Sequence, residues 1–275
     1  MKKEAIGIFD SGVGGLTVFS SIREKFPDED LIYFGDTARV PYGPKSRNTI
    51  IEYSIQNARF LNSFQVKLII VACNTSSAIA IDELRKKFAV PVIGVLEPGA
   101  DQAVRRTRNK RIGIIGTEGT INSNAYQDEM RKIVPEIETF ALPCPLFVPI
   151  VEEGWHDHQI ADIITREYLN PLLTKEIDTL VLGCTHYPVL KPVIQKIVGE
   201  QVVLIDSAEA VTSHLEAFLT TYPENSCSPE GQKARGADFF YVSDNEDKFR
   251  HIASRLLNRD ITNLTKVRLA ESWFV

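Results

Sequence analysis

Short apolar segments alternate with helix-like segments along most of this 275-residue chain, and this alternation limits the fold more than any other feature. The apolar segments are rich in Val, Ile and Leu, which is typical of strands buried on both faces of a parallel sheet. We expect strands over residues 5–10, 31–35, 68–72, 90–96, 111–115, 179–183, 202–205, 238–242 and 265–274. We expect helices over residues 15–25, 46–62, 77–88, 122–133, 158–173, 190–197, 208–220 and 247–257. The pattern predicts the α/β fold class.

The chain also resembles itself at a nearly constant spacing. Residues 6–11 are similar to 112–117, residues 68–75 to 179–186, and residues 92–97 to 203–208, which gives offsets of 106, 111 and 111 positions. Three matches in the same order predict two pseudo-symmetric lobes, each a mostly parallel sheet flanked by helices, with the active site in the cleft between them.

A Pro98-Gly99 pair is expected to break the chain between the two lobes. Lobe one is then discontinuous and comprises residues 1–97 plus 206–275, and lobe two comprises residues 98–205.

Composition and charge exclude several classes of protein. With 44% hydrophobic residues the chain can bury a core, and 31 Lys and Arg against 36 Asp and Glu give a net charge of −5. The basic segment 105–111 is interpreted as a helix end plus a linker, so no nucleic-acid partner is expected. No apolar run approaches the ~20 residues that a membrane span needs, and no signal peptide is recognisable. The chain is therefore expected to be cytoplasmic.

A glycine-rich loop, Gly12-Val13-Gly14-Gly15, follows the first expected strand. Its backbone N–H groups could cradle an anion at a helix start, but a simple tight turn is the favoured interpretation. The spacing matches neither the P-loop nor the dinucleotide fingerprint, so no nucleotide cofactor is expected.

Two of the four cysteines, Cys73 and Cys184, follow equivalent strands of the two lobes. Each is expected before a helix, where the partial positive charge of the helix start can lower a thiol pKa and favour the reactive thiolate. Cys144 and Cys227 lack this setting and are assigned to structure or surface. No Cys-x-x-Cys pair suggests structural zinc.

Two thiols at equivalent positions would face each other across the cleft between the lobes. One thiolate could then remove a proton from one face of a carbon while the opposite thiol donates a proton to the other face, which is what inversion of a stereocentre requires. Asp10 beside Cys73, and Glu152 or His186 beside Cys184, are candidate proton partners. Asp10 could equally cap a helix, Glu152 could be a solvated charge, and His186 could be structural.

A metal site is not expected. His156 and His158 lie in a Trp-His-Asp-His stretch but lack a third ligand at matching spacing.

Hydroxyl, amide and backbone groups at the strand ends could hold a small acid. The candidates are Ser11, Asn74, Thr75, Thr117, Thr120, Thr185 and the loop Pro41-Tyr42-Gly43, whose backbone could bind an anion.

Taken together, these motifs resemble the cofactor-independent aspartate/glutamate racemase superfamily, and within it the members that act on glutamate. The similarity covers the chain nearly end to end and includes residues 7–17, 36–43, 72–76, 116–120 and 183–188.

The resemblance implies proton transfer between L- and D-glutamate without pyridoxal phosphate, metal or nucleotide, supplying D-glutamate for peptidoglycan. It implies that Cys73 acts on one enantiomer and Cys184 on the other, with Asp10, Glu152 and His186 assisting the thiols. The positions that match Ser11, Tyr42, Gly43, Asn74, Thr75 and Thr185 bind substrate in that family, whose members are usually homodimers.

Three other functions stay open at this point. The chain could be a superfamily relative that acts on aspartate or another small acid, a protein whose cleft only binds a small anion, or a thiol redox protein. The last requires the two cysteines to come close enough for a disulfide.

Overall fold

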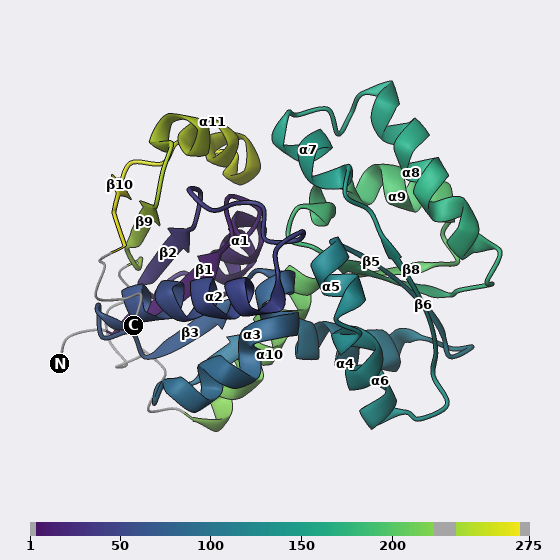
Figure 1. Cartoon of the computed structure of the whole chain (residues 1–275), viewed down its shortest axis with the longest axis horizontal. Coiled ribbons are helices and arrows are strands. Elements are labelled where there is room, and N and C mark those ends of the chain that lie inside the picture. Colours follow the sequence, from purple (N-terminus) through teal and green to yellow (C-terminus); the bar gives the residue numbers. More distant parts are fainter. Residues whose placement is uncertain (1–3, 223–234, 270–275) are drawn as a thin grey trace.

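Two parallel sheets form the centre of the protein (Figure 1), whose computed structural model describes residues 4–222 and 235–269. The first sheet has the order β10 (Leu264–Lys266), β9 (Asp238–Val242), β2 (Leu31–Gly35), β1 (Ile6–Asp10), β3 (Leu68–Val71) and β4 (Val92–Gly94). The second has the order β6 (Glu138–Pro143), β5 (Arg111–Gly116), β7 (Thr179–Gly183) and β8 (Val203–Asp206). Neighbouring strands are parallel throughout both sheets, which confirms the α/β prediction.

The internal repeat of the sequence reappears as a repeat of topology. β1 lies between β2 and β3 with β4 outside, and β5 lies between β6 and β7 with β8 outside. Ile6 pairs with Leu31 and Leu68 on its two sides, and Ile112, its counterpart in the repeat, pairs with Thr139 and Thr179. The two sheets therefore have the same order of four strands, and β9 and β10 extend the first sheet beyond β2.

Helices cover both faces of each sheet, as buried parallel strands require. Around the first sheet they are α1 (Leu16–Lys25), α2 (Arg47–Asn62), α3 (Asn74–Lys87), α10 (Ser207–Thr221) and α11 (Glu246–Leu257). Around the second they are α4 (Leu96–Arg106), α5 (Glu118–Asn122), α6 (Ala125–Ile133), α7 (Phe147–Glu152), α8 (Gln159–Leu173), the 3₁₀ helix η1 (Tyr187–Leu190) and α9 (Lys191–Val198). We call the first sheet with its helices lobe one and the second lobe two.

The predicted chain break at Pro98-Gly99 is wrong, because both residues lie inside α4. Pro98 occupies the first turn of the helix, where backbone N–H groups have no intrahelical acceptor to lose. Gly99 faces Tyr126, and a Cβ atom there would lie 3.3 Å from the phenol oxygen. Gly99 therefore allows α4 to pack closely against Tyr126 and does not end a helix.

Other boundaries also differ from the expectation. The helix expected over 122–133 is divided into α5 and α6 by Asn124, whose φ of 57° lies in the left-handed region. α3 begins at Asn74 and not at residue 77. Strand β6 is not among the expected strands; it is an edge strand whose residues are exposed or only partly buried. The part of the tail beyond residue 269 lies outside the described residues, and β10 covers only Leu264–Lys266.

We propose that the lobes divide close to 97/98 and 205/206, as the repeat suggests, with α4 from Leu96 and β8 to Asp206 belonging whole to lobe two. This division is supported by β1 to β4, β9 and β10 sharing one sheet and β5 to β8 the other. α10, directly after the second boundary, contributes Ala208, Val211 and Leu215 to the core of lobe one.

A buried arginine joins α1 to the edge of the first sheet. The Arg23 guanidinium donates two hydrogen bonds to Asp238 of β9 and further bonds to the carbonyl groups of Phe26, Pro27 and Ala237. The Arg23 side chain is only 7% exposed and that of Asp238 13%. Removing the cation would leave three carbonyls and one Asp238 oxygen without these donors, while the other Asp238 oxygen keeps its hydrogen bond from Arg259 at 2.6 Å.

We therefore expect Arg23→Met to lower the free energy of unfolding by about 3–5 kcal/mol, the usual cost of breaking one side of a buried pair. Arg131→Met is the matched control, since Arg131 is 52% exposed and lies 3.6 Å from Asp128; its expected cost is about 0–1 kcal/mol. Urea unfolding measures both, and equal losses in the two variants would contradict the structural role of Arg23.

Candidate active site

The two predicted thiols line one pocket between the lobes. Cys73 is the N-cap of α3, two residues beyond the end of β3, and Cys184 directly follows β7. The pocket is lined by Ser11, Val40, Pro41, Tyr42, Gly43, Cys73, Asn74, Thr75, Thr117, Val148, Cys184, Thr185 and His186. The pocket is narrow, and the centres of water molecules can occupy only about 30 Å³ of it.

Most of the residues singled out in the sequence lie in this wall, but three do not. Asp10, Glu152 and Thr120 are absent from the lining. Two lining residues, Val40 and Val148, were missed. Both are aliphatic and carry no chemical signal in the sequence that could have identified them.

The surroundings of Cys73 disfavour its thiolate. Burial and the nearby carboxylate of Asp10 raise the pKa of the Cys73 thiol to about 11, against the smaller opposing effects of hydrogen bonds from Ser76 and Ser11. The Ser11 hydroxyl lies 3.7 Å from the sulfur. The expectation that the helix start lowers this pKa is wrong, because desolvation of a buried thiolate outweighs the helix-end charge.

Asp10 lies fully buried at the end of β1. One carboxylate oxygen accepts a hydrogen bond from the backbone N–H of Gly12 at 3.0 Å, and the other has no hydrogen-bond partner among the described residues. Burial raises the pKa of Asp10, although the charge of His186 and backbone N–H groups of the glycine loop act against this. Asp10 therefore both holds the loop and keeps a free oxygen in the interior.

Cys184 heads a chain of polar groups. Its sulfur lies 3.8 Å from Nδ1 of His186, and Nε2 of the same ring lies 3.3 Å from a carboxylate oxygen of Glu152, at an angle that makes an ion pair but no hydrogen bond. The second Glu152 oxygen lies 3.4 Å from Nζ of Lys248 on α11. The chain thus runs from the thiol to the surface and ends on a residue of lobe one.

The charges of His186 and Glu152 stabilise each other. Burial acts to lower the pKa of His186, but the contacts with Cys184 and Glu152 outweigh it and raise the pKa to about 10. Burial acts to raise the pKa of Glu152, yet His186 and Lys248 hold it below its usual value. At neutral pH the pair is therefore an imidazolium and a carboxylate.

Asn74 presents an unused amide to the pocket. Its Oδ1 accepts hydrogen bonds from the hydroxyls of Tyr126 (2.7 Å) and Ser207 (3.2 Å). Its buried Nδ2 has no hydrogen-bond partner within the described parts of the chain. Because an unpaired buried donor is costly, this amide is suited to an anionic ligand.

A cluster of three threonine hydroxyls joins the lobes behind this wall. Thr75 of α3 lies 2.8 Å from Thr117 and 3.2 Å from Thr120 of lobe two, and the latter two lie 3.1 Å apart. Thr117 also caps α5 through the N–H of Thr120. Thr75 and Thr117 line the pocket, whereas Thr120 contacts both hydroxyls without lining it.

Glycines allow the lobes to approach closely here. A Cβ atom on Gly14 would lie 2.4 Å from both Nδ1 of His186 and the Thr185 hydroxyl oxygen. A Cβ atom on Gly119 would lie 2.8 Å from the carbonyl oxygen of Gly43. The glycine loop is therefore packed against the Cys184 segment.

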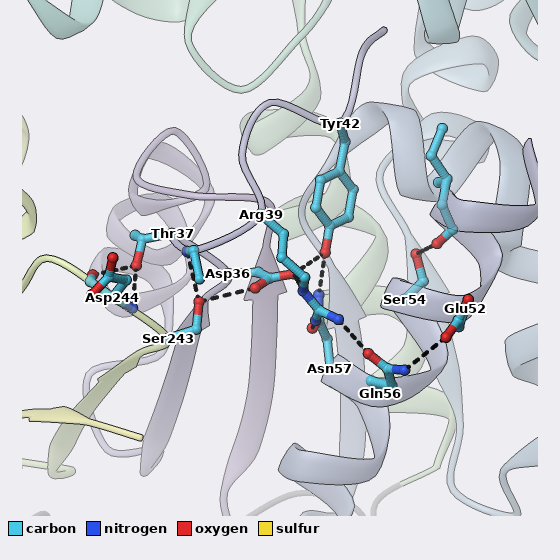
Figure 2. A network of polar contacts seen from close by, with 12 residues as sticks. Asp36, Thr37, Arg39, Tyr42, Glu52, Ser54, Gln56, Asn57, Ser243 and Asp244 are labelled. Atoms are coloured by element: carbon cyan, nitrogen blue, oxygen red, sulfur yellow. Dashed lines mark hydrogen bonds and ion pairs between the residues drawn. The ribbon is translucent and has the colours of Figure 1, made fainter. Parts of the chain in front are cut away.

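The loop Pro41–Gly43 is held by a buried polar network (Figure 2). The Tyr42 hydroxyl bonds Asp36 and accepts a hydrogen bond from Asn57 at 3.0 Å. Arg39 bonds Asp36 at 2.7 Å, and Ser243, just beyond β9, donates to the other Asp36 oxygen at 2.9 Å. The Tyr42 hydroxyl is thus engaged with the network, although the residue lines the pocket.

The remaining candidates lie elsewhere. Cys144 is buried, which raises its thiol pKa, and Cys227 lies outside the described residues. His158 caps α8 by accepting from the N–H of Ile160. Within residues 4–222 and 235–269, no three metal-binding side chains gather, and no helix there is long and apolar enough to cross a membrane.

Comparison with known proteins agrees with this geometry. Residues 12–215 match the family described as Asp/Glu/Hydantoin racemase. The glutamate racemase of Geobacter metallireducens is 48% identical over 269 residues, which cover 98% of each chain.

Solved structures agree as well. The structure of a glutamate racemase from Bacillus anthracis superimposes with a TM-score of 0.92 at 36% identity, covering 98% of this chain and 99% of that one. The glutamate racemase of Francisella tularensis, solved in complex with D-glutamate, has a TM-score of 0.90 at 40% identity, covering 99% of this chain and 100% of that one. The chain therefore belongs to the Asp/Glu/Hydantoin racemase family and, within it, to the glutamate racemases.

Proposed function

We propose that this protein interconverts L- and D-glutamate by proton transfer at Cα between two thiols, Cys73 and Cys184. The observation that carries the proposal is that both sulfurs line one pocket from equivalent strand ends of two pseudo-symmetric lobes. One thiolate removes the Cα proton from one face, and the opposite thiol protonates the resulting carbanion on the other face. The reaction uses only groups of the chain itself, without a cofactor or metal.

Each thiol has its own proton partner. Nδ1 of His186, 3.8 Å from the Cys184 sulfur, is placed to exchange a proton with it, and Glu152 stabilises the imidazolium. At Cys73 the buried Asp10 takes this part, because its raised pKa makes protonation accessible. The two halves of the reaction thus use different acids and bases.

Glutamate would be held without an arginine. The N–H groups at the start of α3 lack intrahelical acceptors and suit a carboxylate. The unpaired amide of Asn74 and the backbone of the loop Pro41–Gly43 add further donors. Hydroxyls complete the set, namely Ser11, Thr75, Thr117 and Thr185. Because the pocket is narrow, we expect the lobes to move apart when glutamate enters.

The proposal extends to the cell. The resemblance implies that the protein acts in the cytoplasm as a homodimer and supplies D-glutamate for peptidoglycan.

Circular dichroism tests the activity directly. After dialysis against chelator and with no cofactor added, the protein is mixed with L-glutamate or with D-glutamate, and both signals are expected to decay to zero. L-aspartate is the specificity control and is expected to keep its signal. Stable glutamate signals from folded, reduced protein would contradict the proposed function.

The two thiols are tested by Cys73→Ser and Cys184→Ser. Each variant is expected to lose roughly 10²–10⁴-fold in kcat/KM in both directions, the usual contribution of a positioned proton-transfer group. Both should still bind glutamate in calorimetry, because the binding donors are unchanged. Cys144→Ser is the matched control and should keep wild-type rates. A racemising Cys184→Ser variant would exclude the two-thiol mechanism.

The charge on His186 has a signature in stability. With a pKa of about 10 in the folded state against about 6.5 when unfolded, its protonated form contributes stability that is complete below pH 6.5 and lost as the pH rises towards 10. The difference in unfolding free energy between wild type and His186→Gln should therefore shrink from pH 7 to pH 10. His214→Gln, at an exposed position of α10, is the control. A difference that stays constant from pH 7 to pH 10 would show that His186 is already neutral at pH 7.

A further inference from the structure

Glu152, the carboxylate of the Cys184 chain, is the last residue of the short helix α7. Carbonyl groups in the last turn of a helix lack intrahelical donors. Here Arg255 supplies them: its Nη2 donates to the carbonyl oxygens of Val151 (3.0 Å) and Glu152 (2.8 Å). A guanidinium at this end also complements the negative end of the helix dipole.

Gly154, two residues beyond the end of α7, is shaped for this contact. Gly154 has a φ of +76°, a conformation that favours glycine. A Cβ atom on it would lie 2.4 Å from Nη1 and 3.0 Å from Cζ of Arg255. The backbone beyond α7 and the guanidinium therefore leave no room between them for a side chain.

This contact crosses from one lobe to the other. Arg255 belongs to α11, whose Phe249, Ile252 and Ala253 are buried in the core of lobe one. α7 belongs to the core of lobe two. In Figure 1 the two helices face each other above the sheets. Lys248 of the same helix α11 approaches the Glu152 side chain at 3.4 Å, although it is 53% exposed and contributes less.

The two thiols differ in whether their polar neighbours depend on the opposite lobe. Ser11 and Asp10, the neighbours of Cys73, come from its own lobe. The chain that serves Cys184 includes a carboxylate whose helix end is held from the opposite lobe. Because Glu152 is the last residue of α7, the position of that helix end sets the 3.3 Å separation between its carboxylate and Nε2 of His186.

We propose that Arg255 is a positioning residue for the Cys184 half of the reaction, capping α7 from lobe one so that Glu152 meets His186. That half is complete only while α11 rests on α7. The inference rests on the proposed two-thiol function. It predicts that Arg255, which does not line the pocket, affects the proton transfer at Cys184 and not the one at Cys73.

The test compares Arg255→Met with Arg250→Met in the full-length protein. Both changes remove a guanidinium from α11, but Arg250 donates to Ile261 within lobe one and does not reach α7. We expect kcat/KM of Arg255→Met to fall roughly tenfold, less than the loss of a whole proton-transfer group. Arg250→Met should keep the wild-type value. Thermal unfolding of both variants checks that they are folded.

Isotope effects separate positioning from general damage. Because L- and D-glutamate are equally stable, kcat/KM must fall equally in both directions, so rates alone do not identify the affected thiol. With Cα-deuterated substrates, a slower Cys184 step raises the isotope effect on kcat/KM for the enantiomer that Cys184 deprotonates. It lowers the effect for the other enantiomer, whose proton is removed by Cys73, towards the equilibrium isotope effect of transfer from carbon to a thiol.

The proposal is supported if, in both Arg255→Met and Gly154→Ala, the isotope effect rises for one enantiomer and falls for the other. Arg255→Lys is expected to recover part of the wild-type values. Unchanged isotope effects in folded Arg255→Met, or the same shifts in Arg250→Met, overturn it. An inactive wild-type protein would instead refute the proposed function, so the two failures are distinguishable. If Arg255→Met does not fold, Gly154→Ala alone decides between the outcomes.

Discussion

The arrangement of this site depends on one constraint, the burial of two parallel sheets whose strand ends meet at a common boundary. Parallel strands must be covered on both faces, so their connecting helices leave only the strand ends free to carry chemistry. Since both sheets use the same order of four strands, the loop after β3 and the segment after β7 occupy equivalent places. Cys73 and Cys184 stand in these two loops and reach one pocket.

Close contact between the lobes then determines the polar chemistry. Gly14 and Gly119 remove the side chains that would keep the lobes apart, and the hydroxyls of Thr75, Thr117 and Thr120 satisfy one another across the boundary. Excluding water in this way makes each buried charge expensive unless it is paired. His186 and Asp10 are both buried, and only the first has a countercharge in direct contact.

The duplicated fold consequently holds two chemically different half-sites. On the Cys73 side, burial and a carboxylate raise the thiol pKa to about 11. On the Cys184 side, an imidazolium lies against the sulfur and is paired with Glu152. A pseudo-symmetric backbone does not impose symmetric side chains, and the reaction needs only two groups on opposite faces of one carbon.

The sequence by itself determined the α/β class, the repeat, and the placement of both thiols at strand ends, because these follow from apolar periodicity and from spacing along the chain. It also identified most of the pocket wall, since strand-end loops such as residues 73–75 and 184–186 are local features. Only the tertiary structure decided that the Cys73 pKa is raised, that the Tyr42 hydroxyl is engaged by Asp36 and Asn57, and that Pro98-Gly99 lies within a helix. It alone brought Arg255 to the end of α7. Desolvation and hydrogen-bond partners depend on contacts between residues distant in sequence, and no local pattern encodes which distant groups will share a buried site.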